Sequence, residues 1–170
     1  MKSNKNLVLL GMMGSGKSTI GYLLSKNLNI KFNDVDKIIE REEGCKISKI
    51  FEKKGEIYFR KIEERISLKL LRSNKKIISL GGGGFINDNV RNEILSNHIS
   101  FWLDWNNSTL INRIKSSKKR PIAFNSTENQ IKKLIYERSK MYSMANFKIN
   151  CEKFSKNEIV KKILDIYEKN

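Results

Sequence analysis

The chain has 170 residues, of which 39% are hydrophobic and 31% are charged, and it carries a formal net charge of +16. These values suit a soluble globular protein that can bury a core of its own. No apolar run is long enough to cross a bilayer, and the N-terminus enters the first predicted strand without a signal-peptide pattern. Cys45 and Cys151 are too few and too isolated for a disulfide framework or a metal site. We therefore expect a cytoplasmic protein with no membrane partner.

The strong positive charge raises the question of a nucleic-acid partner. The basic residues are spread along the chain and are not gathered in one stripe, so we expect no nucleic acid to bind. A milder interpretation is that the electric field helps to attract anionic substrates. Because lysine fills most basic positions, arginine is expected where planar, bidentate contacts matter.

Strand and helix patterns alternate along the whole chain. Such alternation predicts an α/β fold of three layers, in which a mostly parallel five-stranded sheet lies between helices. The predicted strands are 7–10, 31–33, 76–80, 99–103 and 147–150. The predicted helices are 20–28, 37–43, 47–54, 55–72, 87–97, 108–115, 127–144 and 155–168.

Some local features sharpen this prediction. Gly55 is expected to reset the chain between the third and fourth helices. Asn87 is expected to cap the helix that follows it. No repeat, linker or break in composition interrupts the chain, so a single domain over residues 1–170 is predicted. In the fourth helix, four apolar residues recur at helical spacing and are expected to face a core: Ile57, Ile62, Ile66 and Leu70.

Residues 11–18, GMMGSGKS, form a phosphate-binding motif between a predicted strand and a predicted helix. Gly11 and Gly16 permit tight backbone turns. Lys17 reaches terminal phosphates, and the Ser18 hydroxyl meets Mg²⁺. Successive backbone N–H groups and the positive end of the helix form an anion site. Because a glycine-rich turn alone would not need the Lys17-Ser18 pair, the motif predicts binding of a nucleoside triphosphate.

Two carboxylates follow the second predicted strand, in Asp34-Val35-Asp36. Asp34 suits the shell of a metal ion beside Ser18, often through water. Asp36 would then accept the proton of an attacking hydroxyl or orient that hydroxyl. An isolated Asp-x-Asp pair is more often a turn or a helix cap. Which carboxylate serves the metal and which the acceptor is left open by the residues alone.

Two more segments are candidates for the site. The glycine run at residues 81–84 would let an acceptor approach the backbone, although a flexible turn is the alternative. The polar, basic segment at about 116–125 contains Pro121 and predicts a short mobile lid. Ligands of parallel α/β sheets bind beyond the carboxyl ends of the strands, so these segments are expected to converge on one rim.

In this order and at this spacing, the motifs resemble those of the bacterial shikimate kinase family, nearly from end to end. Each motif is weak evidence alone, but the whole set is specific. The resemblance implies a P-loop kinase fold with an acceptor-binding segment at about 33–61. The matching segments are the phosphate loop at 11–19, Asp34 and Asp36, FEKKGEIYFR at 51–60, SLGGG at 79–83, Arg120-Pro121, and the Arg-x-x-x-Tyr element at 138–142.

The resemblance also implies roles for individual residues. Arg60 and Arg138 would hold the carboxylate of shikimate, while Arg113 would lie against the adenine of ATP. The shikimate-binding residues would be Asp36, Arg60, Gly81, Gly82, Gly83 and Arg138. The nucleotide-binding residues would be Gly14, Ser15, Gly16, Lys17, Ser18, Thr19, Arg113 and Arg120, with the metal at Ser18 and Asp34. The catalytic residues would be Lys17, Asp36 and Arg120.

The implied reaction moves the γ-phosphoryl group of ATP to the 3-hydroxyl of shikimate, a step in the biosynthesis of chorismate and aromatic amino acids. It would use one Mg²⁺ per subunit, and ATP and shikimate would be the small-molecule partners of a monomer. One alternative is another small-molecule kinase, such as a gluconate kinase, because gluconate is also a carboxylate. A second alternative is a basic nucleic-acid-binding protein that uses ATP as a switch, which would bind with a steep dependence on salt.

Overall fold

The computed structural model describes residues 5–73, 75–116 and 126–170. Five strands form one sheet in the order β2-β3-β1-β4-β5, and every neighbouring pair is parallel. The strands are β1 Leu7–Leu10, β2 Phe32–Asp34, β3 Ile77–Ser79, β4 Ile99–Asp104 and β5 Phe147–Asn150. The helices are α1 Lys17–Leu28, α2 Val35–Glu43, α3 Ile47–Leu71, the 3₁₀ turn η1 Gly84–Ile86, α4 Asp88–Asn97, α5 Asn107–Lys115, α7 Glu128–Tyr142 and α8 Lys156–Tyr167. The predicted α/β class and five-stranded sheet are confirmed, and the described sheet is wholly parallel.

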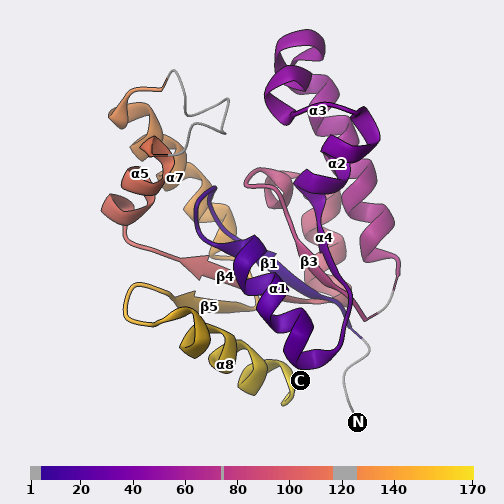
Figure 1. The fold of residues 1–170 in the computed structure, drawn as a ribbon, viewed down its shortest axis with the longest axis vertical. Helices are drawn as coiled ribbons and strands as arrows, with labels where there is room; N and C mark the ends of the chain where they lie inside the picture. Colours follow the sequence, from indigo (N-terminus) through magenta and orange to yellow (C-terminus); the bar gives the residue numbers. More distant parts are fainter. Residues whose placement is uncertain (1–4, 74, 117–125) are drawn as a thin grey trace.

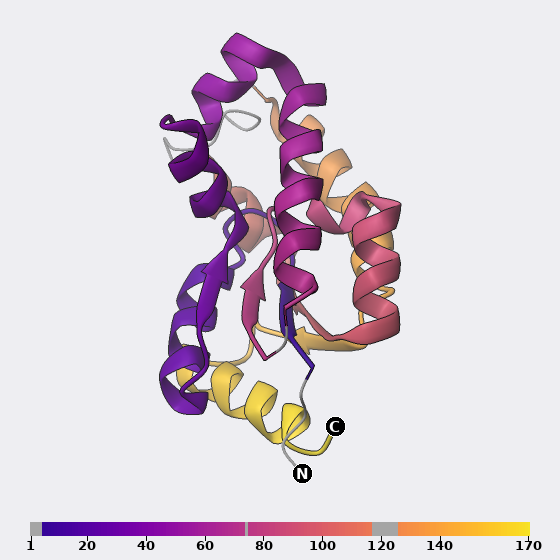
Figure 2. The ribbon, with the colours of Figure 1, turned by 90° about the vertical axis from the view of Figure 1, so that its right-hand side faces the viewer.

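Strand β1 divides its side chains between two hydrophobic cores. Leu7 and Leu9 pack in the core that includes residues of α1 and α8. Val8 and Leu10 pack in the opposite core, with residues of α3, α4, α5 and α7. Successive side chains of a strand point to opposite faces, so an uninterrupted apolar run is what a sheet covered on both sides requires. Figure 2 shows the sheet between these two layers of helices.

The carboxyl end of β1 is the point where the order of the strands reverses. After β1 the chain builds β2 and β3 on one side, and it then crosses to β4 and β5 on the other side. Crevices of this kind are where open α/β sheets bind ligands. The loop from β1 to α1 lies there, with α2 and α3 on one side and α5 and α7 on the other (Figure 1). In the part of the chain that the structure describes, no helix has the length and apolar character needed to cross a membrane.

Helix α3 contains the break that the sequence predicts at Gly55. This glycine has φ 78° and ψ 172°, so two helical segments meet there at an angle. Beyond it, Ile62 and Ile66 are buried as predicted. Ile57 is 77% exposed, and the prediction that it faces a core is wrong. The reason is the helix period, because Ile57 stands five positions before Ile62, about 140° round a helix of 3.6 residues per turn. Its side chain therefore points away from the face that buries Phe59 and Ile62.

The N-terminal cap of α4 agrees with the prediction. The Asn87 side chain accepts a hydrogen bond from the backbone N–H of Val90, at 3.0 Å from N to Oδ1. Such a cap satisfies one of the free N–H groups at a helix start and typically stabilises it by about 1 kcal/mol. It also fixes where α4 begins, directly after η1.

Candidate active site

The loop between β1 and α1 forms the floor of the site. Gly11 has φ 140° and Gly16 has φ 88°, conformations that other residues rarely adopt. The Lys17 ammonium group lies inside the loop and donates to the carbonyls of Gly11 and Met12, at 2.7 and 3.0 Å. The loop thus presents a buried cation and the N-terminal N–H groups of α1 to the same space, as phosphate binding requires.

Ser18 and Asp34 lie side by side at the edge of this floor. The Ser18 hydroxyl donates to Oδ2 of Asp34 at 2.5 Å, and Oδ1 of Asp34 accepts from the backbone N–H of Lys37 at 3.3 Å. Asp34 is therefore also the cap of α2, as the structural alternative predicted. Hydroxyl and carboxylate oxygens are the ligands that Mg²⁺ prefers, with water and phosphate completing its shell. The donor set fits that ion.

A cavity of about 290 Å³ opens above the phosphate loop. It brings together the loop, both carboxylates of the Asp-x-Asp pair and part of the glycine run, from three different strand ends. Convergence on one rim is thus confirmed for these segments. The lining residues are Met13, Gly14, Gly16, Lys17, Ser18, Thr19, Asp34, Asp36, Ser79, Leu80 and Gly82.

Asp36 carries the most strongly perturbed carboxylate of the site. Burial raises its pKa to about 6, and the negative charges of Glu63 and Asp34 add to the effect, while Lys17 opposes it. A carboxylate with a pKa of about 6 is mostly ionised at neutral pH and still accepts a proton readily. The electrostatics therefore suit Asp36 to take a proton from a hydroxyl group.

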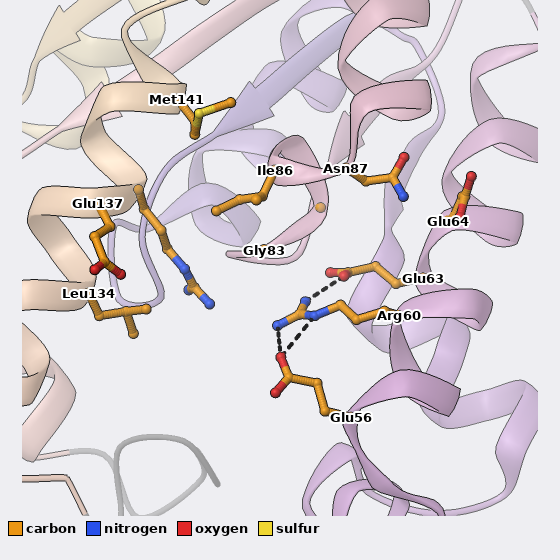
Figure 3. A pocket seen from close by; sticks show the side chains of 12 residues that line it. Glu56, Arg60, Glu63, Glu64, Gly83, Ile86, Asn87, Leu134, Glu137 and Met141 are labelled. Atoms are coloured by element: carbon orange, nitrogen blue, oxygen red, sulfur yellow. Dashed lines mark hydrogen bonds and ion pairs between the residues drawn. The ribbon is translucent and has the colours of Figure 1, made fainter.

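A second cavity, of about 490 Å³, lies beside the first. In Figure 3, Arg60 and Glu63 of α3 form one wall and Leu134 and Glu137 of α7 form the other. Gly83 lies between these walls and its neighbour Gly82 lines the first cavity, so the glycine run is the shared boundary.

Arg60 points into the second cavity and is held by two carboxylates (Figure 3). Its Nη1 donates to Oε2 of Glu63 at 2.6 Å, and its Nε and Nη2 donate to Oε1 of Glu56 at 3.2 and 3.0 Å. Glu63 is 3% exposed and Glu56 is largely exposed. The buried pair fixes the guanidinium group, whereas the exposed carboxylate can yield its place to another anion.

Arg138 lies on α7, across the cavity from Arg60, and it is buried. Its Nε and Nη1 have no hydrogen-bond partner among the described residues. A charged donor without a partner is costly in a protein interior, about 1–3 kcal/mol or more. Its Nη1 comes within 3.0 Å of the place where a Cβ on Gly82 would stand. These donors are aimed at the boundary between the two cavities and suit an anionic ligand.

Tyr142 of α7 supports the glycine run that separates the two cavities. Its hydroxyl donates to the carbonyl of Gly82. Burial raises the pKa of Tyr142 to about 12, so the phenol stays protonated and remains a donor. Gly82 is also close to Met13 of the phosphate loop, since its Cβ would lie 3.4 Å from the Met13 backbone nitrogen. Gly82 thus lies between α7 and the phosphate loop.

On the opposite side of the phosphate loop, Arg113 lies flat over Trp105. The guanidinium carbon is 3.8 Å from the centre of the indole ring, a cation–π contact of about 0.5–2 kcal/mol. Arg113 Nη1 donates to the carbonyl of Gly14 at 3.3 Å, and Trp105 Nε1 donates to that of Ser15 at 2.9 Å. The two side chains make a flat, partly exposed platform next to the phosphate site.

Comparison with known proteins decides the family. The family described as shikimate kinase matches residues 13–168. The shikimate kinase of Sulfurihydrogenibium sp. (strain YO3AOP1) is 42% identical over 160 residues, which cover 94% of this chain and 96% of that protein. The chain belongs to the shikimate kinase family. A structure of shikimate kinase from Acinetobacter baumannii in complex with shikimate matches with a TM-score of 0.90 and 28% identity, over 97% of this chain and 93% of that one.

Membership of the shikimate kinase family confirms the predicted fold and the predicted activity, transfer of a phosphoryl group from ATP to shikimate. A gluconokinase from Sinorhizobium meliloti 1021 also matches, with a TM-score of 0.58 and 14% identity. At that identity the likeness shows a shared fold alone. The gluconate kinase alternative therefore has no support beyond the architecture that both kinds of kinase use.

The residues that the family resemblance singles out lie in different parts of the site. Arg60 and Arg138 line the second cavity, Asp36 lines the first, and the glycine run lies between them. A Cβ on Gly81 would meet carboxylate oxygens of Asp36 and Glu63. Arg113 lies at the phosphate loop, where it donates to the Gly14 carbonyl. The expected lid at 116–125, with Arg120, lies outside the described residues from 117 onward.

Two residues of the site are missed by the motif analysis. Glu63 stands three positions after Arg60, a spacing at which helical side chains meet, and this signal could have found the pair. Trp105 gives no signal in the sequence, since a tryptophan after a strand is ordinarily part of a core. Its place under Arg113 depends on how α5 returns to the phosphate loop.

Proposed function

We propose that this chain binds ATP on the 11–19 loop and shikimate between α3 and α7, and that it phosphorylates the 3-hydroxyl of shikimate. The observation that carries this assignment is Arg138, a buried guanidinium group across the cavity from Arg60, two of whose donors have no partner among the described residues. Two arginines on opposite walls suit the planar carboxylate of the acceptor. The substrate carboxylate would replace Glu56 at Arg60 and supply the missing partner of Arg138.

Asp36 is the proposed proton acceptor. The cavity above the phosphate loop includes its side chain, and its raised pKa suits proton transfer near neutral pH. An acceptor held by Arg60 and Arg138 would present a hydroxyl near the shared boundary formed by Gly82. The proton of that hydroxyl would pass to Asp36 as the oxygen attacks the terminal phosphorus of ATP.

Lys17, the loop amides and Arg120 are the proposed phosphate ligands. On binding ATP, Lys17 would exchange its two carbonyl contacts for phosphate oxygens. Ser18 and Asp34 would hold Mg²⁺, which neutralises phosphate charge when it is bound. We propose that Arg120, on a lid at about 116–125, adds its charge only when both substrates are present and water has been excluded.

We also propose one domain over residues 1–170, with an acceptor-binding segment at about 33–61, acting as a monomer in the cytoplasm. The support for one domain is that all five strands join one sheet, and the free cysteines suit a reducing compartment. Nucleic acid and membrane are not proposed as partners.

The direct test is release of ADP from ATP with shikimate, with gluconate and with no acceptor. We expect ADP release that depends on shikimate and on Mg²⁺, and background release with gluconate. Equal release with and without an acceptor would contradict the proposed site, as would a preference for gluconate. RNA added at low salt should not change the rate, which tests the nucleic-acid alternative.

A further inference from the structure

We infer that Trp105 is a positioning residue for the nucleotide, which supports Arg113 against the base and orients an N–H group toward the phosphates. This inference rests on the proposed placement of ATP. Trp105 lies in the turn between β4 and α5, 90 positions from the phosphate loop in the sequence, and it joins that loop through its indole N–H. No sequence motif assigns it a role.

The first step of the argument concerns Arg113. The long side chain of arginine has many rotamers. Its planar guanidinium group stacks well on a ring when one rotamer is fixed with the two planes facing each other. Here the indole covers one face of the guanidinium group at 3.8 Å, and Nη1 is tied to the Gly14 carbonyl. We expect the other face to receive a flat partner, and a purine base has the matching shape and π-surface. The expected arrangement is indole, guanidinium and base in one stack.

The second step concerns the hydrogen bond from Trp105 to Ser15. The carbonyl of Ser15 and the N–H of Gly16 belong to the same planar peptide unit, in which they point in opposite directions. The indole therefore holds the Ser15 carbonyl on its own side at 2.9 Å and turns the Gly16 N–H toward the other side. That amide precedes Lys17 and belongs to the set that would contact phosphate. One side chain thus orients a base contact and a phosphate contact together.

The segment after Trp105 is itself anchored. Glu152, in the loop between β5 and α8, accepts from the backbone N–H of Asn106 at 3.2 Å and from the Thr109 hydroxyl at 2.7 Å. These two bonds join the start of α5 to a second loop at the same end of the sheet. The backbone that carries Trp105 is therefore fixed from both sides, as a support for Arg113 requires.

Two substitutions separate the two roles. Trp105→Phe keeps an aromatic face under Arg113 but loses the donor to Ser15, whereas Trp105→Leu loses both. We expect the KM for ATP to rise about threefold in the Phe variant and about tenfold in the Leu variant. The KM for shikimate and kcat at saturating ATP should stay within about twofold. Tyr22→Leu is the matched control, since it also removes an aromatic ring beneath a cation, here Lys26, but Tyr22 is exposed and lines neither cavity.

Inorganic tripolyphosphate, as a competitive inhibitor against ATP, reports the phosphate contact without a base. Its inhibition constant should rise about threefold in both variants, because both lose the Ser15 bond. An unchanged constant would overturn the role in orienting the Gly16 amide. Equal KM values for ATP in the two variants would overturn the stack. A parallel rise of the KM for shikimate would indicate a merely structural role and would overturn the inference.

Fluorescence gives a readout that does not depend on activity. ATP titrated into the wild-type protein should alter the emission of the partly exposed Trp105, and the signal should vanish in Trp105→Phe, where only the buried Trp102 remains. A signal retained in that variant would overturn the inference. Failure of the proposed function is distinguishable, because it would appear as wild-type ADP release that does not depend on shikimate.

Discussion

Asp36 and Glu63 direct carboxylate oxygens at the same point beside Gly81. A Cβ on Gly81 would lie 2.6 Å from Oδ1 of Asp36 and closer still to Oε1 of Glu63. Glu63 gives its other oxygen to Arg60 at 2.6 Å. Burial and the nearby negative charge of Glu63 together raise the pKa of Asp36 to about 6. Glu63 thus holds Arg60 in place and also raises the pKa of Asp36, the proposed proton acceptor.

Asp36→Asn should lower kcat by about 10²–10⁴, because an amide cannot take the proton of the attacking hydroxyl. The affinity for ATP should remain close to that of the wild type, as equilibrium titration would show. The free energy of unfolding at pH 8 should rise by about 1–3 kcal/mol, since the substitution removes a carboxylate that burial destabilises. Near-normal turnover would contradict the role of Asp36 as proton acceptor. A lower free energy of unfolding would contradict its raised pKa.

The pH profile follows from the same group. Below pH 6 Asp36 gains a proton, so kcat/KM for shikimate should fall about tenfold per pH unit. Stability should move the other way, because the folded-state pKa lies above the ordinary 3.8 and the folded chain binds this proton more tightly. The destabilisation from ionised Asp36 is fully present above pH 6 and is relieved as the pH falls toward 3.8. In Glu63→Gln the kinetic inflection should shift to lower pH; an inflection that stays in place would exclude Glu63 as a cause.

Gly83→Ala should raise the KM for shikimate about tenfold and leave the KM for ATP unchanged. The added Cβ would lie 2.8 Å from Cζ and 2.9 Å from Nη2 of Arg60, so the guanidinium group must move. Gly84→Ala is the matched control, because its Cβ would meet its nearest neighbour, Cβ of Leu80, at an ordinary 3.4 Å. Steady-state kinetics of the two variants provides the test. Equal effects would mean that the displacement of Arg60 is not the cause.

Arg138→Met should raise the KM for shikimate at least 100-fold with little loss of thermal stability. The substitution removes a buried cation, two of whose donors have no partner among the described residues, and keeps a side chain of similar length. The free energy of unfolding should therefore change little, while shikimate loses a charged contact. Thermal unfolding and initial rates measure the two effects. A large drop in Tm with an unchanged KM would show instead that Arg138 stabilises the fold.

Arg120→Ala should lower kcat severely and leave shikimate affinity mostly intact. A lid arginine that reaches the transferring phosphate stabilises the transition state more than the bound acceptor. Binding of shikimate measured by calorimetry, beside kcat from a coupled assay, separates the two. Equal losses of affinity and turnover would contradict this division.

Local sequence was sufficient wherever neighbours along the chain decide the structure. The phosphate loop, the Asn87 cap and the break at Gly55 each depend on the conformational preferences of a few adjacent residues, and the structure has all three. The uninterrupted apolar run of β1 and the alternation of strands with helices predicted the parallel sheet, because both faces of such a sheet must be covered. The order of the motifs was enough to indicate the family.

Tertiary structure decided what depends on distant segments. Glu63 meets Asp36 only because α3 returns beside the end of β3, and Trp105 supports Arg113 only because the turn after β4 packs against the phosphate loop. Ile57 is apolar, but it lies on the face of α3 opposite to buried Phe59 and Ile62, so it is exposed. Burial, pKa and side-chain contacts between remote segments follow from packing, and a linear pattern does not specify which elements will meet.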